Sequence, residues 1–181
     1  TPDGEDQLVA FAIVEALAGT GTPAVQEKLI PYCRASAGKM RNIALFAVVC
    51  IAERYEIPLS EYQHLSELFK AAVKDDDTRI VIASVKALLT MLDEEVEAVL
   101  LHLIGRNGQL DQLILNNLQG GGRSFVALTR KYPSFQRDQK KTVIEYILPQ
   151  LNELASSDDE EIRNARAEFF AQLVGEWTDA D

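Results

Sequence analysis

Apolar residues recur with helical periodicity along almost the whole chain, and short breaks of glycine, proline or aspartate interrupt them. Gly19-Thr20-Gly21, Asp75-Asp76-Asp77 and the triglycine 120–122 are three such breaks. Hydrophobic residues make up 47% of the chain and aromatic residues only 7%. Ala and Leu carry most of the apolar content, and both favour helices over sheets. The pattern predicts an all-α fold of about ten helices, in which short connections make sequential helices antiparallel neighbours.

The breaks and local capping signals set the expected helix boundaries. Thr22 and Pro23 are typical of an N-cap followed by the first helical residue. Ser60 with Gln63 indicates a capping box, and Pro149 falls inside a long predicted helix. The predicted helices span about residues 8–18, 23–35, 39–55, 61–73, 78–92, 94–104, 109–118, 123–131, 136–155 and 162–177.

One short arrangement recurs where helices are predicted to start. It spans 39–44 (KMRNIA), 77–83 (DTRIVIA) and 160–165 (EEIRNA), with a weaker copy at 122–127 (GRSFVA). Each copy places an arginine after an acidic or small-residue loop, and an alanine follows within a few residues. The four arginines are separated by 38, 44 and 40 residues. Helical repeats of HEAT or armadillo type have periods of about 40–47 residues, so the spacing predicts a repeat array.

The pattern resembles the second helix of a HEAT repeat, in which an acidic loop precedes an arginine at the helix start. The best copy is 157–166 (SDDEEIRNAR), and the preceding helix carries a proline in 147–151 (ILPQL), which would bend it around its neighbour. The resemblance covers most of residues 1–181 and implies one right-handed α-solenoid domain of about four to five antiparallel helix pairs. The stretch 93–133 departs from the pattern, because three short helices are predicted where two are expected.

The recurrent arginines have a physical role in such an array. A guanidinium at the start of one helix can bridge to carboxylates on the adjacent turn and so tie successive repeats together. Arg41, Arg79 and Arg163 are therefore predicted to be structural. Because the chain begins at Thr1 rather than Met, we expect it to be a piece of a longer protein.

Motifs for catalysis or metal binding do not emerge from the sequence. His64 and His102 are the only histidines, and neither has a partner at metal-ligand spacing. The triglycine is followed by Arg-Ser rather than by Gly-Lys-Ser/Thr, so it does not match a phosphate-binding loop. Acidic runs at 75–77 and 158–161 lack the alternating ligands of a calcium loop. We predict no enzymatic activity, no cofactor and no metal.

The cysteines and the absence of targeting signals bear on the compartment. Cys33 and Cys50 lie in apolar helical stretches and are predicted to be buried reduced thiols. The sequence contains no signal peptide and no run of about 18 apolar residues. We expect an intracellular protein, cytoplasmic or nuclear, without a membrane partner.

Charge is distributed unevenly along the chain. The formal net charge is −10, which argues against a surface that binds nucleic acid. Residues 123–141 nevertheless carry +5, whereas the chain from Glu145 onward carries −8. Such an asymmetry can orient a partner and speed its approach. The alternative is a solvated basic turn that balances the acidic end. The candidate partner-binding residues in this segment are Arg123, Arg130, Lys131, Tyr132, Phe135, Arg137, Lys140 and Lys141.

The function expected from the resemblance is a protein-interaction scaffold or adaptor. A partner, possibly an acidic protein segment in view of the basic residues, would lie on a surface lined by the second helices. A HEAT relative of the TOG type, which binds tubulin through Trp and basic residues on turns, is one alternative. Trp177 is the only tryptophan and falls in the last predicted helix, which counts against it. A nucleic-acid-binding HEAT-like protein is the other alternative, which the net charge disfavours.

Overall fold

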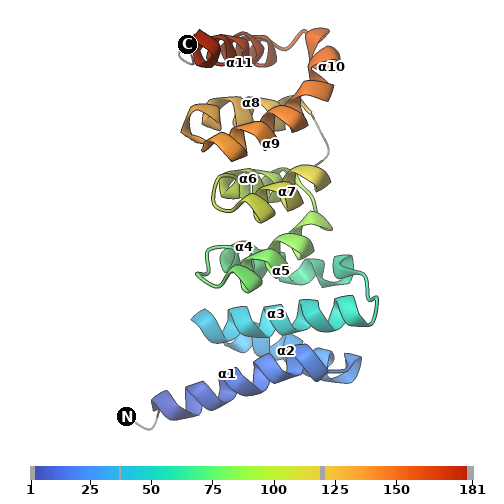
Figure 1. Cartoon of the computed structure of the whole chain (residues 1–181). Helices are drawn as coiled ribbons and strands as arrows, with labels where there is room; N and C mark the ends of the chain where they lie inside the picture. The colour runs from blue at the N-terminus through green and yellow to red at the C-terminus, as the bar shows by residue number, and fades with distance from the viewer. Residues whose placement is uncertain (1–2, 37, 119–120, 179–181) are drawn as a thin grey trace. The chain divides into compact units, whose positions relative to one another are not determined.

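The structure is a computed structural model that describes residues 3–36, 38–118 and 121–178, and these residues form helices without any β-strand (Figure 1). The prediction of an all-α chain is confirmed. The elements in order are α1 (Asp3–Thr20), α2 (Pro23–Ala35), α3 (Gly38–Arg54), the 3-10 helix η1 (Leu59–Leu65), α4 (Ser66–Ala72), α5 (Thr78–Leu89), α6 (Glu94–Leu103), α7 (Gly108–Asn117), α8 (Gly122–Lys131), η2 (Tyr132–Ser134), α9 (Arg137–Ile147), η3 (Leu148–Gln150), α10 (Leu151–Ala155) and α11 (Glu160–Thr178). The chain is divided into two compact units, residues 1–96 and residues 97–181.

Helix α3 is the centre of the first unit. Helices α1 and α2 pack against it, and so does α5, which in turn packs against α4. The packing follows from the composition of α3, since a helix that is apolar all round must be covered on more than one side. Its fully or nearly fully buried side chains are Ala44, Leu45, Ala47, Val48, Val49, Ile51 and Ala52.

Two polar side chains and one glycine hold the first three helices together. Gln26 of α2 is buried and donates from Nε2 to the backbone oxygen of Val48, at 2.8 Å. Arg54 of α3 donates to the carbonyls of Ala18 and Gly21 at the end of α1. A Cβ at Gly21 would lie 2.6 Å from the backbone oxygen of Leu17 and 2.6 Å from Cδ1 of Ile51, so glycine is required at this contact. The orphan carbonyls at the end of α1 are thus satisfied by a neighbouring helix.

An aromatic cluster forms the centre of the second unit, where α8 packs on α11, α7 on α9 and α10 on α11. Phe169 of α11 is fully buried, and its ring meets Phe125 and Tyr132 edge-on, with centroids 6.1 and 5.3 Å apart. Edge-to-face rings are a favoured aromatic geometry. Gly122 permits the contact between α8 and α11, because a Cβ there would collide with the side chain of Ile162.

Most predicted helices are found close to their expected bounds, but the predictions of two continuous helices are wrong. The predicted helix 61–73 is the 3-10 helix η1 followed by α4, with a kink at Tyr62 (φ −96°, ψ 20°), and Ser60 does not cap a single helix. The predicted helix 136–155 is divided into α9, η3 and α10 where Pro149 removes a backbone donor. The stretch 93–133 does hold three helices, each of ten residues.

Adjacent phenylalanines on α11 provide a matched test of this packing. Phe169→Ala should lower the free energy of unfolding by about 3–5 kcal/mol, because it empties the aromatic cluster. Phe170→Ala should cost less than about 1 kcal/mol, since the side chain of Phe170 is 47% exposed. Urea denaturation followed by circular dichroism measures both. Equal losses in the two variants would contradict the described core of the second unit.

Candidate functional site

An open groove of about 470 Å³ lies between α8 and α11 of the second unit. Helix α8 contributes Val126 and Arg130, and the remaining lining residues belong to the first half of α11 and the turn before it. Val126 and Ala165 are buried and give the groove its apolar part. The lining residues from the second segment are Asp159, Glu160, Glu161, Asn164, Ala165 and Glu168.

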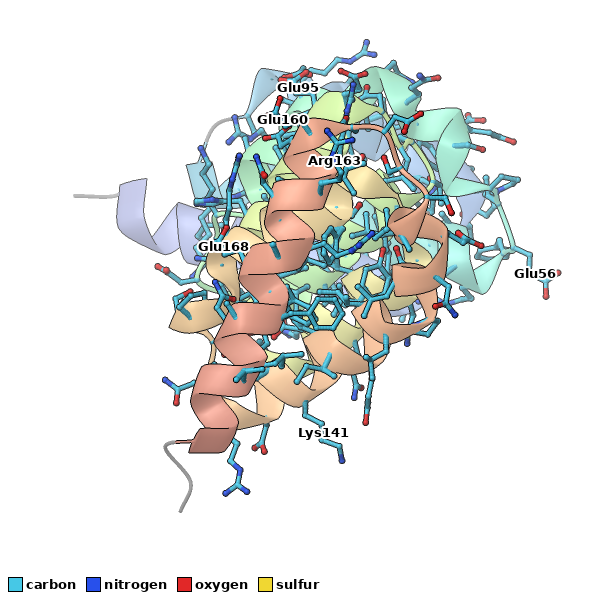
Figure 2. The ribbon with its side chains drawn as sticks, turned by 90° about the horizontal axis from the view of Figure 1, so that it is seen from above. Glu56, Glu95, Lys141, Glu160, Arg163 and Glu168 are labelled. Atoms are coloured by element: carbon cyan, nitrogen blue, oxygen red, sulfur yellow. The ribbon has the colours of Figure 1, made fainter. Side chains whose placement is uncertain are left out.

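The groove is negatively charged. Four carboxylates line it, and the guanidinium of Arg130 is the one base among the lining residues. Arg130 of α8 reaches Glu161 of α11 with an Nη2–Oε1 distance of 2.6 Å. Both side chains are well exposed, so this ion pair adds at most about 1 kcal/mol to stability. Figure 2 shows Glu160, Arg163 and Glu168 on α11, with the two glutamates among the groove residues.

Helix capping explains why part of this charge is present. Asp159 accepts hydrogen bonds through Oδ1 from the backbone N–H groups of Glu161, at 2.8 Å, and Ile162, at 3.4 Å. Glu160 and Glu161 occupy the first turn of α11, where the helix dipole favours carboxylates. Glu168 lies further along the helix, where capping does not account for it. The acidic lining of the groove thus consists of the capping residues at the start of α11 and of Glu168 further along the same helix.

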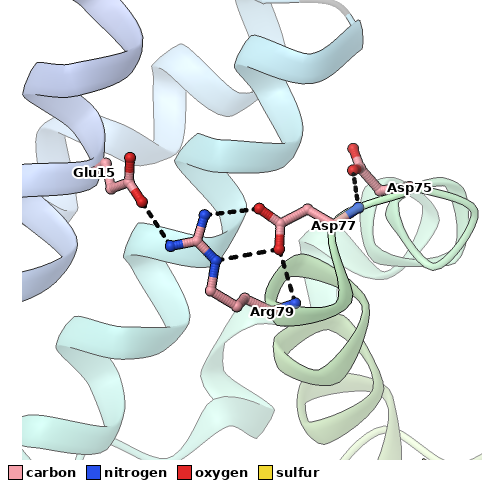
Figure 3. Close-up of polar contacts among 4 residues, drawn as sticks. All are labelled: Glu15, Asp75, Asp77 and Arg79. Atoms are coloured by element: carbon pink, nitrogen blue, oxygen red, sulfur yellow. Dashed lines mark hydrogen bonds and ion pairs between the residues drawn. The ribbon is translucent and has the colours of Figure 1, made fainter. Parts of the chain in front are cut away.

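Among Arg41, Arg79 and Arg163, Arg79 has the most extensive ion-pair network (Figure 3). Its guanidinium donates to both carboxylate oxygens of Asp77, the N-cap of α5, and to Glu15 Oε1 on α1 at 2.6 Å. The hydrogen bond from Arg79 lowers the pKa of the Asp77 carboxyl, and Asp77 and Glu15 in turn raise the pKa of Arg79. Asp75 supports the turn by accepting from the Asp77 N–H at 2.8 Å. This residue therefore links α5 to its own acidic loop and to α1.

Arg41 and Arg163, which were also predicted to be structural, make different contacts. Arg41 donates to Oδ1 of Asn42 at 3.3 Å, and Asn42 donates to Oδ2 of Asp75 at 2.8 Å, so Asn42 carries the link from α3 to the acidic loop. Arg163 is exposed and donates to the backbone oxygen of Asp158 at 3.1 Å, within its own loop. The bridging role expected of all three arginines is thus seen directly only at Arg79.

The basic segment 123–141 is spread over core and surface. The exposed side chains are Arg123, Arg130, Arg137 and Lys141. Lys140 is half-buried, with its ammonium 5.1 Å from the centre of the Tyr132 ring. Tyr132 and Phe135 are buried, at 0% and 6% exposure, so these rings belong to the core rather than to a surface that anchors a partner. We exclude them from the site proposed below.

Lys131 belongs to a half-buried polar cluster around the turn between α6 and α7. Its Nζ donates to the carbonyls of Leu101 and His102, both at 3.0 Å, and so satisfies the end of α6. Gly105 in this turn has φ +99°, and its N–H donates to Oδ1 of the buried Asp111 at 2.9 Å. Burial lowers the pKa of Lys131 and raises that of Asp111. This lysine acts within the fold.

Sequence reasoning missed both the groove and Asp111. A groove depends on which two helices become neighbours, and no local pattern encodes that. Asp111 could have been found, since it lies between Leu110 and Ile114 on the buried face of α7. A carboxylate at an otherwise apolar position of an amphipathic helix is a signal of a buried polar contact.

The remaining expectations concern metals, thiols and tryptophan. In the described part of the chain no three His, Cys, Asp or Glu side chains gather as metal ligands would. Cys33 and Cys50 are both free thiols, and burial raises the pKa of Cys33 to about 12. Cys33 is fully buried as predicted, whereas Cys50 is only half-buried. The side chain of Trp177 lies outside the described residues.

Comparison with known proteins identifies no relative of this chain. No family model matches the chain, and no match is found among curated proteins or solved structures. Among the described helices, none is long and apolar enough to span a membrane. The helix packing and the groove are thus the features from which a function can be argued.

The buried carboxyl of Asp111 gives a pH-dependent prediction. Because its pKa is raised in the folded protein, the folded state takes up a proton at Asp111 before the unfolded state does as the pH falls. Acidification therefore favours folding through this group, and Asp111→Asn lacks that gain. We expect the stability of the variant relative to the native protein to decline between pH 7 and pH 4, measured by urea denaturation.

The exposed Asp76 provides the control, because Asp76→Asn removes one carboxyl group from a solvated loop. The same pH trend in both variants would show that the effect does not come from burial of Asp111.

Proposed function

We propose that this chain is a non-enzymatic scaffold of the HEAT type, which binds a segment of another protein in the groove between α8 and α11. Its place is inside the cell, where two free thiols remain reduced. Two observations support the repeat arrangement. The helices that begin with the recurrent arginines pack on one another within each unit, α3 on α5 and α8 on α11. Each of α3, α5 and α11 also packs on the helix that precedes it.

The groove is the single observation that carries the function. It lies between two arginine-led helices, and those helices line the binding surface in repeat proteins of this kind. Buried Val126 and Ala165 offer apolar contact, and Asn164 offers an amide that can bond to a peptide backbone. An apolar part with a polar rim is the ordinary composition of a protein-binding site.

The charge of the groove favours a basic partner segment. Asp159, Glu160, Glu161 and Glu168 outnumber Arg130, so the lining has a formal charge of −3. Lysines and arginines on a partner would find complementary charge here, and an acidic segment would be repelled. The proposal thus departs from the acidic partner expected from residues 123–141, several of which are occupied within the fold.

Peptide binding tests the proposal. A fluorescent lysine-rich amphipathic peptide should bind the native chain, and a glutamate-rich peptide of the same length should not, as measured by fluorescence anisotropy. Replacing two rim carboxylates, Glu160→Lys with Glu168→Lys, should weaken binding about 5- to 30-fold, because each reversed charge contributes on the order of 0.5–1 kcal/mol. Added salt should weaken the native interaction in the same direction.

A matched variant separates the groove from general charge. Glu145→Lys with Glu153→Lys makes the same change in net charge at exposed positions outside the groove. If this control loses as much affinity as the groove variant, the peptide responds to the overall charge of −10 and the groove is not its site.

A further inference from the structure

The ion pair between Arg130 and Glu161 joins the two walls of the groove. Arg130 lies in the last turn of α8 and Glu161 in the first turn of α11, and both residues line the groove. The Nη2–Oε1 distance is 2.6 Å, and the two side chains are 65% and 60% exposed. Val126 precedes Arg130 by one turn, and Ala165 follows Glu161 by one turn. Because residues four apart share one face of a helix, the ion pair adjoins the apolar part of the groove.

The fold does not need this ion pair to hold α8 against α11. The ring of Phe169 meets Phe125 edge-on within the core, and Gly122 allows α8 to approach Ile162 of α11. An ion pair between well-exposed side chains contributes little to stability, because water already solvates both charges. Exchange of one cation for another at the carboxylate of Glu161 therefore leaves the packing of the two helices unchanged.

The bases of α11 itself are engaged elsewhere. Arg163 and Arg166 donate to backbone oxygens that precede the start of α11, at 3.1 and 3.2 Å. Neither is among the residues that line the groove, whereas Arg130 is. The guanidinium of Arg130 offers Glu161 the same kind of charge that a basic partner segment would bring. Arg130 and such a segment thus compete for one carboxylate.

We propose that Arg130 is an internal competitor, which occupies Glu161 in the free protein and is displaced from it when a basic side chain of the partner segment binds. The inference rests on the proposed function, because it concerns the same groove. Arg130 sets the specificity of the site, since a segment without a cation cannot replace it at Glu161. Arg130 also lowers the affinity for every basic segment, because one ion pair is lost for the one that is formed.

Arg130→Gln tests the proposal on the whole chain with the fluorescent lysine-rich peptide. The variant should bind about three- to tenfold more tightly than the native chain, because Glu161 is then unoccupied and a like charge is removed from the groove. A variant that binds no more tightly than the native chain would overturn the proposal.

Lys86→Gln is the matched control for the lost charge. Lys86 of α5 pairs with Glu53 of α3 at 2.6 Å, and both side chains are partly exposed, so the control also removes a cation from an ion pair between two helices. This pair belongs to the first unit, outside the groove. The control should change the affinity by less than about twofold, since distant exposed charges are screened. A gain equal to that of Arg130→Gln would assign the effect to net charge and refute the competition.

A double-mutant cycle with Glu161→Gln distinguishes competition from a general effect of charge. In the native chain this change removes one ion pair from the free state and one from the bound state, so the affinity should fall by about twofold or less. In the Arg130→Gln chain it removes only the pair with the peptide, and the affinity should fall about three- to tenfold. Equal losses in the two backgrounds would show that Arg130 and the peptide do not share Glu161.

The failure of this inference can be told from failure of the proposed function. If neither the native chain nor any variant binds the peptide, both are wrong. If Glu160→Lys with Glu168→Lys weakens binding but Arg130→Gln does not strengthen it, the groove is the binding site and only the competition is wrong. Circular dichroism should show the same helical signal in all variants, since Arg130 and Glu161 are exposed.

Discussion

Both units depend on one constraint, which is that a helix with apolar residues on more than one side must be covered on more than one side. In the first unit, α3 meets this constraint by contact with α1, α2 and α5. In the second, Phe169 of α11 enters a cluster with Phe125 and Tyr132. The other features follow from these contacts, because the capping loops, the groove and the arginine network lie where packed helices meet their neighbours.

Glycines set how closely those helices approach. Gly21 lets the end of α1 touch Ile51 of α3, and Gly122 lets the start of α8 touch Ile162 of α11. The sequence pattern indicates that both glycines mark breaks between helices, and both lie at such breaks in the structure. Their second role, as positions without a side chain at a helix contact, depends on a partner residue about 30 to 40 positions away. Local sequence patterns do not carry that information.

The sequence predicted the helices well and the surface poorly, and the reason is physical. Caps such as Asp77 and Asp93 act on backbone groups two or three residues away, so they can be read locally. The kink at Tyr62 and the burial of Tyr132 are set by tertiary contacts. Counted along the chain, the charges of residues 123–141 indicate a single basic surface. In space, Lys131 turns to the end of α6, and Arg130 faces the acidic start of α11.

The placement of Lys131 has a consequence for the chemical reactivity of the protein. Its ammonium is shared between the carbonyls of Leu101 and His102. Lys141 is exposed, and its Nζ lies 3.9 Å from Oε1 of Glu145, which is the long end of the range for an ion pair. Acylation of Lys141 would change the surface and leave the helices intact. Acylation of Lys131 would remove the ammonium that satisfies the last carbonyls of α6 and loosen the turn at Gly105. Two lysines ten residues apart would thus report different events under an amine-directed reagent, one the state of the surface and the other the opening of the fold.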